Sequence, residues 1–185
     1  MIQKGVIHGR FQVLHNDHLR YLLAGRDKCQ HLVVGITNPD PSLTKDDPAA
    51  PLRHRLEENP LTYFERYLMV RAVLLESGSS PQSFSVVPFP INMPDLYQYY
   101  VPLDGTFFLT IYDSWGKKKQ EMFQSLGLKI HVLWEKPMEE KGLNSTDIRK
   151  RMAWGEEWET LVPPSVQSLM KEWRIPERLG QLKTS

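Results

Sequence analysis

Residues 5–37 read GVIHGRFQVLHNDHLRYLLAGRDKCQHLVVGIT and decide the fold. Residues 5–9 form a short apolar run bounded by glycines, which is typical of a buried strand. Apolar residues at positions 19, 22 and 23 have helical spacing, and Asp17 is the expected N-cap of that helix. Residues 31–37 predict a second buried strand. A strand, a helix and a strand in this order form a βαβ unit, which implies parallel pairing through a right-handed crossover.

The rest of the chain continues this alternation. Further strands are expected at residues 84–88, 106–112 and 129–134, and further helices at residues 62–77, 117–126, 147–154 and 164–173. Thr62 and Glu65 predict a capping box at the start of the first of these helices. We therefore predict an α/β fold, a Rossmann-like doubly wound parallel sheet of about five strands with C-terminal helices. Residues 1–185 are expected to form one domain, with an irregular polar tail after about residue 176.

The composition argues against several classes of function. The 185 residues include 23 Lys and Arg against 22 Asp and Glu, and a net charge of +1 argues against a nucleic-acid partner. Cys29 is the only cysteine, so neither an internal disulfide nor a cysteine metal cluster can form, and a reducing, cytoplasmic location is expected. The sequence has no stretch of about 20 apolar residues, so no membrane span is expected.

Residues 9–18 (GRFQVLHNDH) lie where an open α/β sheet binds its ligand, between the first strand and the first helix. Backbone N–H groups and the helix dipole favour phosphate at such a position. His15 and His18 are three residues apart and can both face the crevice, where they can stabilise charge that develops on an α-phosphate. A pair of exposed histidines is by itself weak evidence. A zinc site is disfavoured because only Asp17 is nearby as a further ligand.

Residues 143–152 (LNSTDIRKRM) form the second informative segment. Ser145 and Thr146 are expected to cap a helix whose first-turn amides form another phosphate cradle. Arg149, one turn further on, can reach the β- and γ-phosphates and neutralise the leaving group. The alternative reading is an ordinary capped helix with solvated basic residues.

Together the two segments resemble the HxGH nucleotidyltransferases, and most closely the archaeal-type nicotinamide-nucleotide adenylyltransferases. The resemblance also covers NPLTYFER at residues 59–66, WGEEW at residues 154–158 and LVPPSV at residues 161–166. It implies that a nucleoside monophosphate is transferred from a nucleoside triphosphate with Mg²⁺ to a phosphorylated small molecule, with release of pyrophosphate. AMP from ATP and nicotinamide mononucleotide are the favoured substrates, which gives a role in NAD biosynthesis. Such enzymes are commonly homo-oligomers.

The resemblance also implies roles for individual residues. The expected catalytic residues are His15, His18 and Arg149. The expected nucleotide-binding residues are Gly9, Arg10, Phe11, Gln12, Asp17, Asn144, Ser145 and Thr146. Acceptor binding is assigned to aromatic and basic side chains in the middle of the chain, namely Tyr97, Tyr100, Trp115 and Lys117.

Several positions depart from the family pattern. Asp17 replaces the motif glycine, and a carboxylate about 4 Å from a phosphate charge costs roughly 4 kcal/mol at an effective dielectric of 20. Asp17 therefore caps its own helix, joins Mg²⁺ coordination or weakens triphosphate binding, and we expect capping. Val13 stands where the family has proline, and Glu58 where it has a basic residue. The long loop at residues 38–59 is expected to act as a lid.

Two alternatives remain open. Cytidylyltransferases share both motifs, so the chain could transfer CMP from CTP to a phosphorylated alcohol or a phosphonate. The choice between bases depends on hydrogen bonds to the base edge, which the sequence does not reveal. The second alternative is a regulatory protein that binds nucleotide but is catalytically impaired, as Asp17 and Glu58 would suggest.

Overall fold

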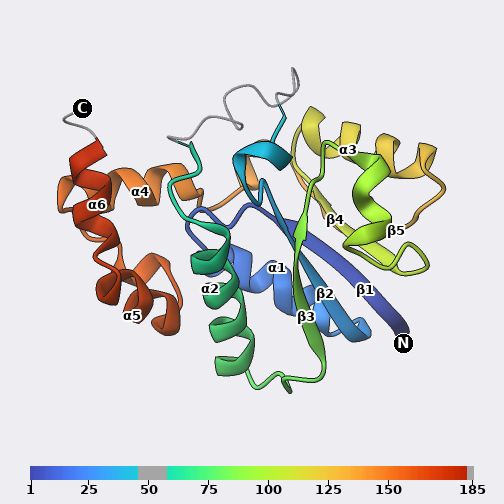
Figure 1. Cartoon of the computed structure of the whole chain (residues 1–185), viewed down its shortest axis with the longest axis horizontal. Helices are drawn as coiled ribbons and strands as arrows, with labels where there is room; N and C mark the ends of the chain where they lie inside the picture. Colours follow the sequence, from blue (N-terminus) through green and yellow to red (C-terminus); the bar gives the residue numbers. More distant parts are fainter. Residues whose placement is uncertain (46–57, 183–185) are drawn as a thin grey trace.

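The computed structural model describes residues 1–45 and 58–182. Its centre is a five-stranded sheet in the order β3-β2-β1-β4-β5, and every neighbouring pair of strands is parallel (Figure 1). The strands are β1 (Ile2–Gly9), β2 (Cys29–Thr37), β3 (Phe84–Phe89), β4 (Thr106–Ile111) and β5 (Lys129–Glu135). The order reverses beside β1, so the structure confirms the predicted Rossmann-like sheet and places a ligand crevice at the carboxyl end of β1.

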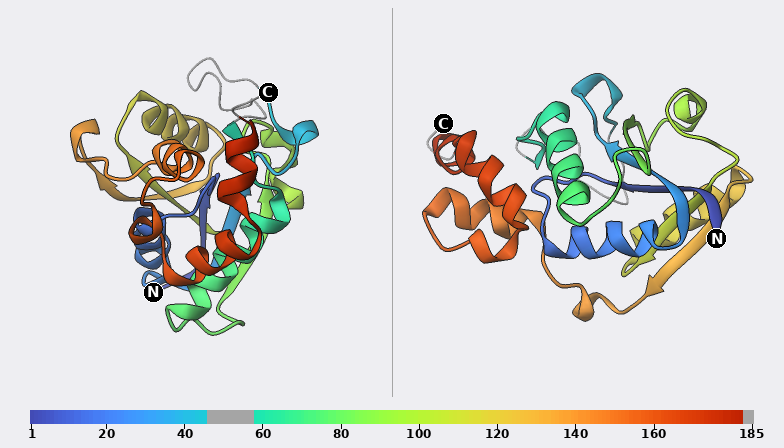
Figure 2. Two further views of the ribbon diagram at one scale, coloured as in Figure 1. Left: turned by 90° about the vertical axis from the view of Figure 1, so that its left-hand side faces the viewer. Right: turned by 90° about the horizontal axis from the view of Figure 1, so that it is seen from below.

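Six α-helices accompany the sheet in the described residues. They are α1 (Asn16–Arg26), α2 (Tyr63–Glu76), α3 (Ser114–Ser125), α4 (Ser145–Trp154), α5 (Pro164–Glu172) and α6 (Ile175–Leu182). The last three lie together at one end of the molecule, on the far side of α2 from α3 and β5 (Figures 1 and 2). Short 3-10 helices occupy Pro41–Leu43, Pro94–Tyr99, Met138–Glu140 and Glu159–Leu161.

Alternate residues of β1 face two separate cores, as the twofold period of a strand requires. Ile7 belongs to the larger core, which includes Leu22 of α1 and Met69 of α2. Val6 belongs to the smaller core, which includes Phe123 of α3. Both faces of the sheet are therefore packed against helices, and a ligand is expected at an end of the sheet.

Residues 175–182 form helix α6, so the expected irregular tail after about residue 176 is wrong as far as residue 182. Ile175 and Leu179 lie four residues apart in α6 and are buried in the larger core. Pro176 lies in the first turn, where a missing N–H group costs nothing. Arg178 forms an ion pair with Glu65 at 2.7 Å. Because a proline, charges and polar residues separate the few apolar residues of this segment, the pattern resembled a tail.

The long loop expected at residues 38–59 falls partly outside the described residues, so its proposed role as a lid stays a prediction. Its described part contains the 3-10 helix at Pro41–Leu43. The predicted helix at residues 62–77 is confirmed as α2, with the Thr62–Glu65 capping box in place. No helix in the described part of the chain is long and apolar enough to cross a membrane.

Candidate active site

A cavity of about 600 Å³ opens at the carboxyl end of β1. Its lining comes from the segment between β1 and α1, the ends of β2 and β4, the start of α3 and the segment before α4. Ten of the residues expected at the site line it: Gly9, Arg10, Phe11, His15, Asp17, His18, Trp115, Asn144, Ser145 and Thr146. The structure thus brings together two segments that lie more than a hundred residues apart in the sequence.

His15 and His18 form reciprocal hydrogen bonds at the start of α1. The Nδ1 atom of His15 accepts from the backbone N–H of His18 at 3.4 Å, and Nδ1 of His18 accepts from the backbone N–H of His15 at 3.4 Å. The two rings stack with centroids 3.7 Å apart. Because each Nδ1 accepts, the proton of the neutral ring lies on Nε2, which leaves that atom as a donor.

Burial keeps both histidines neutral near pH 7. Burial lowers the pKa of His15 to about 4, an effect that the nearby Asp17 partly offsets. Burial also lowers the pKa of His18, and the charges of His15 and Arg10 lower it further. Two neutral Nε2–H donors in a fixed pair can bind phosphate oxygens without first having to reorganise.

Asp17 does not cap α1, so that expectation is wrong. The N-cap is His15, whose reciprocal bonds with His18 form the capping box. The Oδ2 atom of Asp17 instead accepts from the backbone N–H of Leu143 at 2.7 Å. A side chain on Gly142 would place its Cβ 2.3 Å from the same oxygen, so only glycine permits this close approach. Asp17 therefore ties α1 to the segment that precedes α4.

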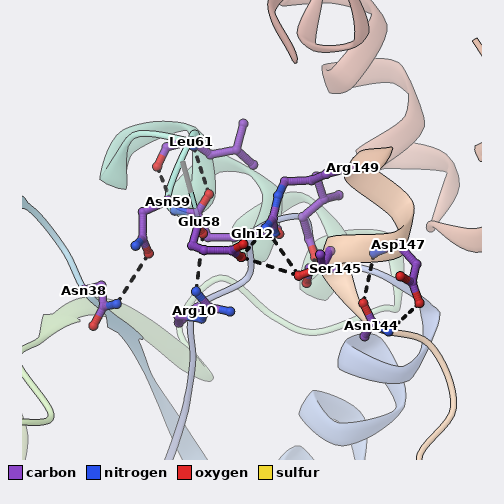
Figure 3. A network of polar contacts seen from close by, with 12 residues as sticks. Arg10, Gln12, Asn38, Glu58, Asn59, Leu61, Asn144, Ser145, Asp147 and Arg149 are labelled. Carbon is purple, nitrogen blue, oxygen red and sulfur yellow. Dashed lines mark hydrogen bonds and ion pairs between the residues drawn. The ribbon is translucent and has the colours of Figure 1, made fainter. Parts of the chain in front are cut away.

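The start of α4 also differs from the expectation. Asn144 is the N-cap, because its Oδ1 accepts from the backbone N–H of Asp147 at 2.9 Å. Ser145 and Thr146, which were expected to cap, are the first residues of the helix. The Ser145 hydroxyl donates to the carbonyl of Val13 at 2.9 Å, and this bond docks α4 onto the histidine turn (Figure 3).

Arg149 and Gln12 lie behind the cavity wall. Arg149 is buried, and its guanidinium donates to the Gln12 carbonyl and to Oε2 of Glu58, the latter at 2.5 Å (Figure 3). Burial lowers the pKa of Arg149, and the Glu58 carboxylate offsets part of the effect. The Gln12 side chain makes two bonds to the backbone of Leu61, at 3.0 and 2.9 Å. The Gln12 side chain is therefore used for structure and not for binding nucleotide. Arg149 is paired with a carboxylate where a phosphate was expected.

Arg66, the last residue of the NPLTYFER segment, is buried near the site and had no role predicted from the sequence. Its guanidinium donates to the backbone carbonyls of Arg10, Thr37 and Asn38 at 3.1, 2.7 and 2.8 Å. Burial lowers the pKa of Arg66 to about 10. These bonds join the carboxyl ends of β1 and β2 to α2 and so fix one wall of the cavity. The available signal was the single charge on the otherwise apolar face of α2.

The four expected acceptor residues do not come together. Trp115 lines the cavity. Tyr97 is 2% exposed, and its hydroxyl donates to the carbonyl of Ile91 at 2.5 Å. Tyr100 packs against the smaller core, and Lys117 pairs with Glu135 at 3.3 Å beside a separate hollow. The tyrosine-rich segment lacked a periodic pattern, so the sequence did not show which rings turn inward.

Residues 6–151 match the family model described as cytidylyltransferase-like. The chain belongs to the cytidylyltransferase-like family. This finding confirms the predicted nucleotidyltransferase class, because the family's model spans the histidine turn and the start of α4 in one match.

Two relatives of this cytidylyltransferase-like chain differ in their stated activities. It is 47% identical over 175 residues to phosphonoformate cytidylyltransferase of Streptomyces viridochromogenes, with 95% of this chain and 94% of the relative covered. It is 33% identical over 187 residues to nicotinamide-nucleotide adenylyltransferase of Pyrococcus furiosus, with 100% and 91% covered.

A solved structure agrees in fold. A bifunctional NMN adenylyltransferase/ADP ribose pyrophosphatase from Francisella tularensis matches with a TM-score of 0.67 at 14% identity. The match covers 97% of this chain and 52% of that chain, so this protein spans about half of the bifunctional one. At this identity the match supports the fold alone.

Proposed function

We propose that this protein transfers CMP from CTP to a small phosphonate and releases pyrophosphate. The observation that carries the proposal is the 47% identity to a phosphonoformate cytidylyltransferase over nearly the whole of both chains. Burial of Tyr97 agrees with it, because that residue was assigned to acceptor binding on the resemblance to the nicotinamide-nucleotide enzymes and lies in the core instead. The favoured substrates therefore change from ATP and nicotinamide mononucleotide to CTP and a phosphonate.

The histidine turn supplies the charge stabilisation for this reaction. An oxygen of the phosphonate attacks the α-phosphorus of CTP while the bond from that phosphorus to the bridging oxygen breaks, and pyrophosphate leaves with the bond's electrons. The Nε2–H groups of His15 and His18 donate to the oxygens around the α-phosphorus, where negative charge accumulates. Thr146 and the amides at the start of α4 bind the departing phosphates. Arg149 neutralises them when it exchanges Glu58 for phosphate.

We also propose that Mg²⁺ enters with the triphosphate. In the described residues no group of three or more His, Cys, Asp or Glu could hold a metal ion. The cavity carboxylates already have partners, since Asp17 accepts from Leu143 and Asp113 accepts from the backbone N–H of Gly116 at 2.8 Å. Mg²⁺ in such sites takes most of its ligands from phosphates and water, which suits this arrangement. Homo-oligomer formation remains a proposal, testable by light scattering.

Adenylyl transfer to nicotinamide mononucleotide is the second candidate. It is favoured by the 33% identity over the full chain to the Pyrococcus furiosus enzyme. A panel that measures pyrophosphate release with CTP or ATP, each with phosphonoformate or nicotinamide mononucleotide, separates the two. Turnover with CTP and phosphonoformate supports the proposal, whereas turnover with only ATP and nicotinamide mononucleotide overturns it. Nucleotide binding without turnover, unaffected by His18→Ala, would indicate the regulatory alternative.

A further inference from the structure

His8 is a buried polar side chain that neither the sequence reading nor the reaction described above uses. It is the second-last residue of β1 and lines the same cavity as the histidine turn. Only 5% of its surface is exposed. Its ring packs against Phe89 and Phe123, with centroids 5.7 and 5.6 Å away. An imidazole therefore lies at the junction of the smaller core and the cavity.

Neither ring nitrogen of His8 has a hydrogen-bond partner among the described residues. A buried polar atom without a partner costs about 1–3 kcal/mol, and native proteins leave few of them. His15 and His18, by contrast, both use their Nδ1 atoms within the protein. The missing partner of His8 is therefore expected to come from outside the protein. Both nitrogens are buried, so such a partner has to reach them through the cavity that His8 lines.

The charge near His8 favours an anion. Burial lowers the pKa of His8 well below its usual value, and the positive charge of Lys119 lowers it further. The ring is therefore neutral and offers one N–H donor and one acceptor. Lys119 also lines the cavity, and so does Asn92, whose amide donates to the carbonyl of Lys45 at 3.2 Å and has a second hydrogen. An oxyanion beside His8 would accept the imidazole N–H within the field of the Lys119 ammonium.

We infer that His8 belongs to the acceptor subsite and donates a hydrogen bond to an anionic oxygen of the acceptor, a phosphonate or carboxylate oxygen. The inference rests on the proposed function, because it assigns His8 to the acceptor. The nucleotide phosphates are assigned to the histidine turn and the start of α4, which provide donors for them. Phe89 and Phe123 hold the ring, so His8 selects small anionic acceptors through one directed bond.

The first test replaces His8 and compares the two Michaelis constants. His8→Phe keeps a planar ring between Phe89 and Phe123 but removes both nitrogens. It is expected to raise KM for phosphonoformate about tenfold and to leave KM for CTP within about twofold, since a hydrogen bond to a charged group is lost. His8→Asn keeps an N–H donor and is expected to recover part of the loss, and it serves if His8→Phe does not fold.

His131→Phe is the matched control. His131 is also a strand histidine with its ring edge-on to a phenylalanine, Phe108, at 5.9 Å, but it is not a cavity residue. The His131→Phe substitution is expected to leave KM for phosphonoformate and KM for CTP unchanged. Equal changes in the two constants after His8→Phe, or no change in either, would overturn the inference.

The second test does not depend on turnover. Phosphonoformate is added to ¹⁵N-histidine-labelled protein without nucleotide, and the ring signals are followed by NMR. The His8 signals are expected to shift with the ligand concentration, and the His131 signals are expected to stay. A shift at His8 without CMP transfer would contradict the proposed function but not the subsite. CMP transfer with unmoved His8 signals, or no shift and no transfer, would contradict the subsite.

Discussion

The two halves of the cavity differ in how far their polar groups are already satisfied. In the proposed phosphate half, the histidine pair and Asp17, with Arg149 behind the cavity wall, all have partners within the protein. In the proposed acceptor half, His8 lacks partners for both ring nitrogens among the described residues. Groups fixed in advance suit a transition state whose charge appears at a known place. A group left unpaired suits a ligand that brings its own oxygen. We therefore expect the phosphate half to stabilise the transition state and the acceptor half to select the acceptor.

Among the substitutions considered, replacement of His18 is expected to lower turnover the most. His18→Ala removes an Nε2–H donor at the α-phosphate and is expected to lower kcat about 10²–10³-fold, in the range found for loss of one preorganised donor. Steady-state pyrophosphate release measures this loss. A thermal melt provides the control, because a capping interaction alone is worth only about 1 kcal/mol. A collapse of stability as large as the loss of activity would make His18 a structural residue.

A substitution of Asp17 tests whether turnover depends on the fixed geometry of the phosphate half. Asp17→Ala leaves the Leu143 N–H without its carboxylate and loosens the segment before Asn144, so turnover is expected to fall about tenfold. Asp17→Asn keeps an acceptor oxygen and should lose less. Faster turnover by Asp17→Ala would show instead that the carboxylate opposes triphosphate binding.

A substitution of Glu58 tests the ion pair between Glu58 and Arg149, which the triphosphate is expected to displace. Glu58→Gln removes the charge that pairs with Arg149 but keeps an oxygen acceptor at the same place. We expect KM for the nucleotide to fall a few-fold, while stability falls by about 1–3 kcal/mol because a buried guanidinium loses its counter-charge. Denaturant unfolding and nucleotide titration measure the two effects. Weaker nucleotide binding would give Glu58 a positive role in the complex.

Acid should destabilise both halves gradually through their neutral histidines. Burial lowers the pKa of His8, His15 and His18 in the folded state, to about 4 for His15. The unfolded chain therefore takes up protons near pH 6.5 while the folded chain does not. The neutral histidines therefore contribute to the free energy of unfolding fully above pH 6.5, and this contribution is lost as the pH falls toward 4. Each unit of difference between the folded and unfolded pKa corresponds to about 1.4 kcal/mol. Melting temperatures across this range measure the loss, and His15→Gln should flatten the slope. A melting temperature that stays constant or rises on acidification would contradict the prediction.

The sequence predicted the sheet and the meeting of the two motifs because both follow from local patterns. Glycine-bounded apolar runs define the parallel strands, and such a sheet places the ends of its strands at one edge. The bonds that shape the site could not be read in the same way. Asp17 was expected to cap its own helix because aspartate prefers that position, but the backbone N–H of Leu143, more than a hundred residues away, binds it instead.

Partners of this kind depend on the tertiary structure. His8 looked like an ordinary residue of a buried strand, and only its unpaired nitrogens beside the cavity distinguish it. The tyrosine segment at residues 97–100 posed the same difficulty. Its rings were assigned to the acceptor on resemblance, whereas the Tyr97 hydroxyl bonds within the chain. Long-range contacts therefore decided which polar residues serve the fold and which remain available for a ligand.

The most direct measurement offers the protein both nucleotides and both acceptors at once. Equimolar CTP, ATP, phosphonoformate and nicotinamide mononucleotide are incubated with Mg²⁺, and the products are identified by mass spectrometry. We expect a single new product, CMP joined to the phosphonate, together with pyrophosphate. A dinucleotide made from ATP and nicotinamide mononucleotide, without any CMP adduct, would contradict it.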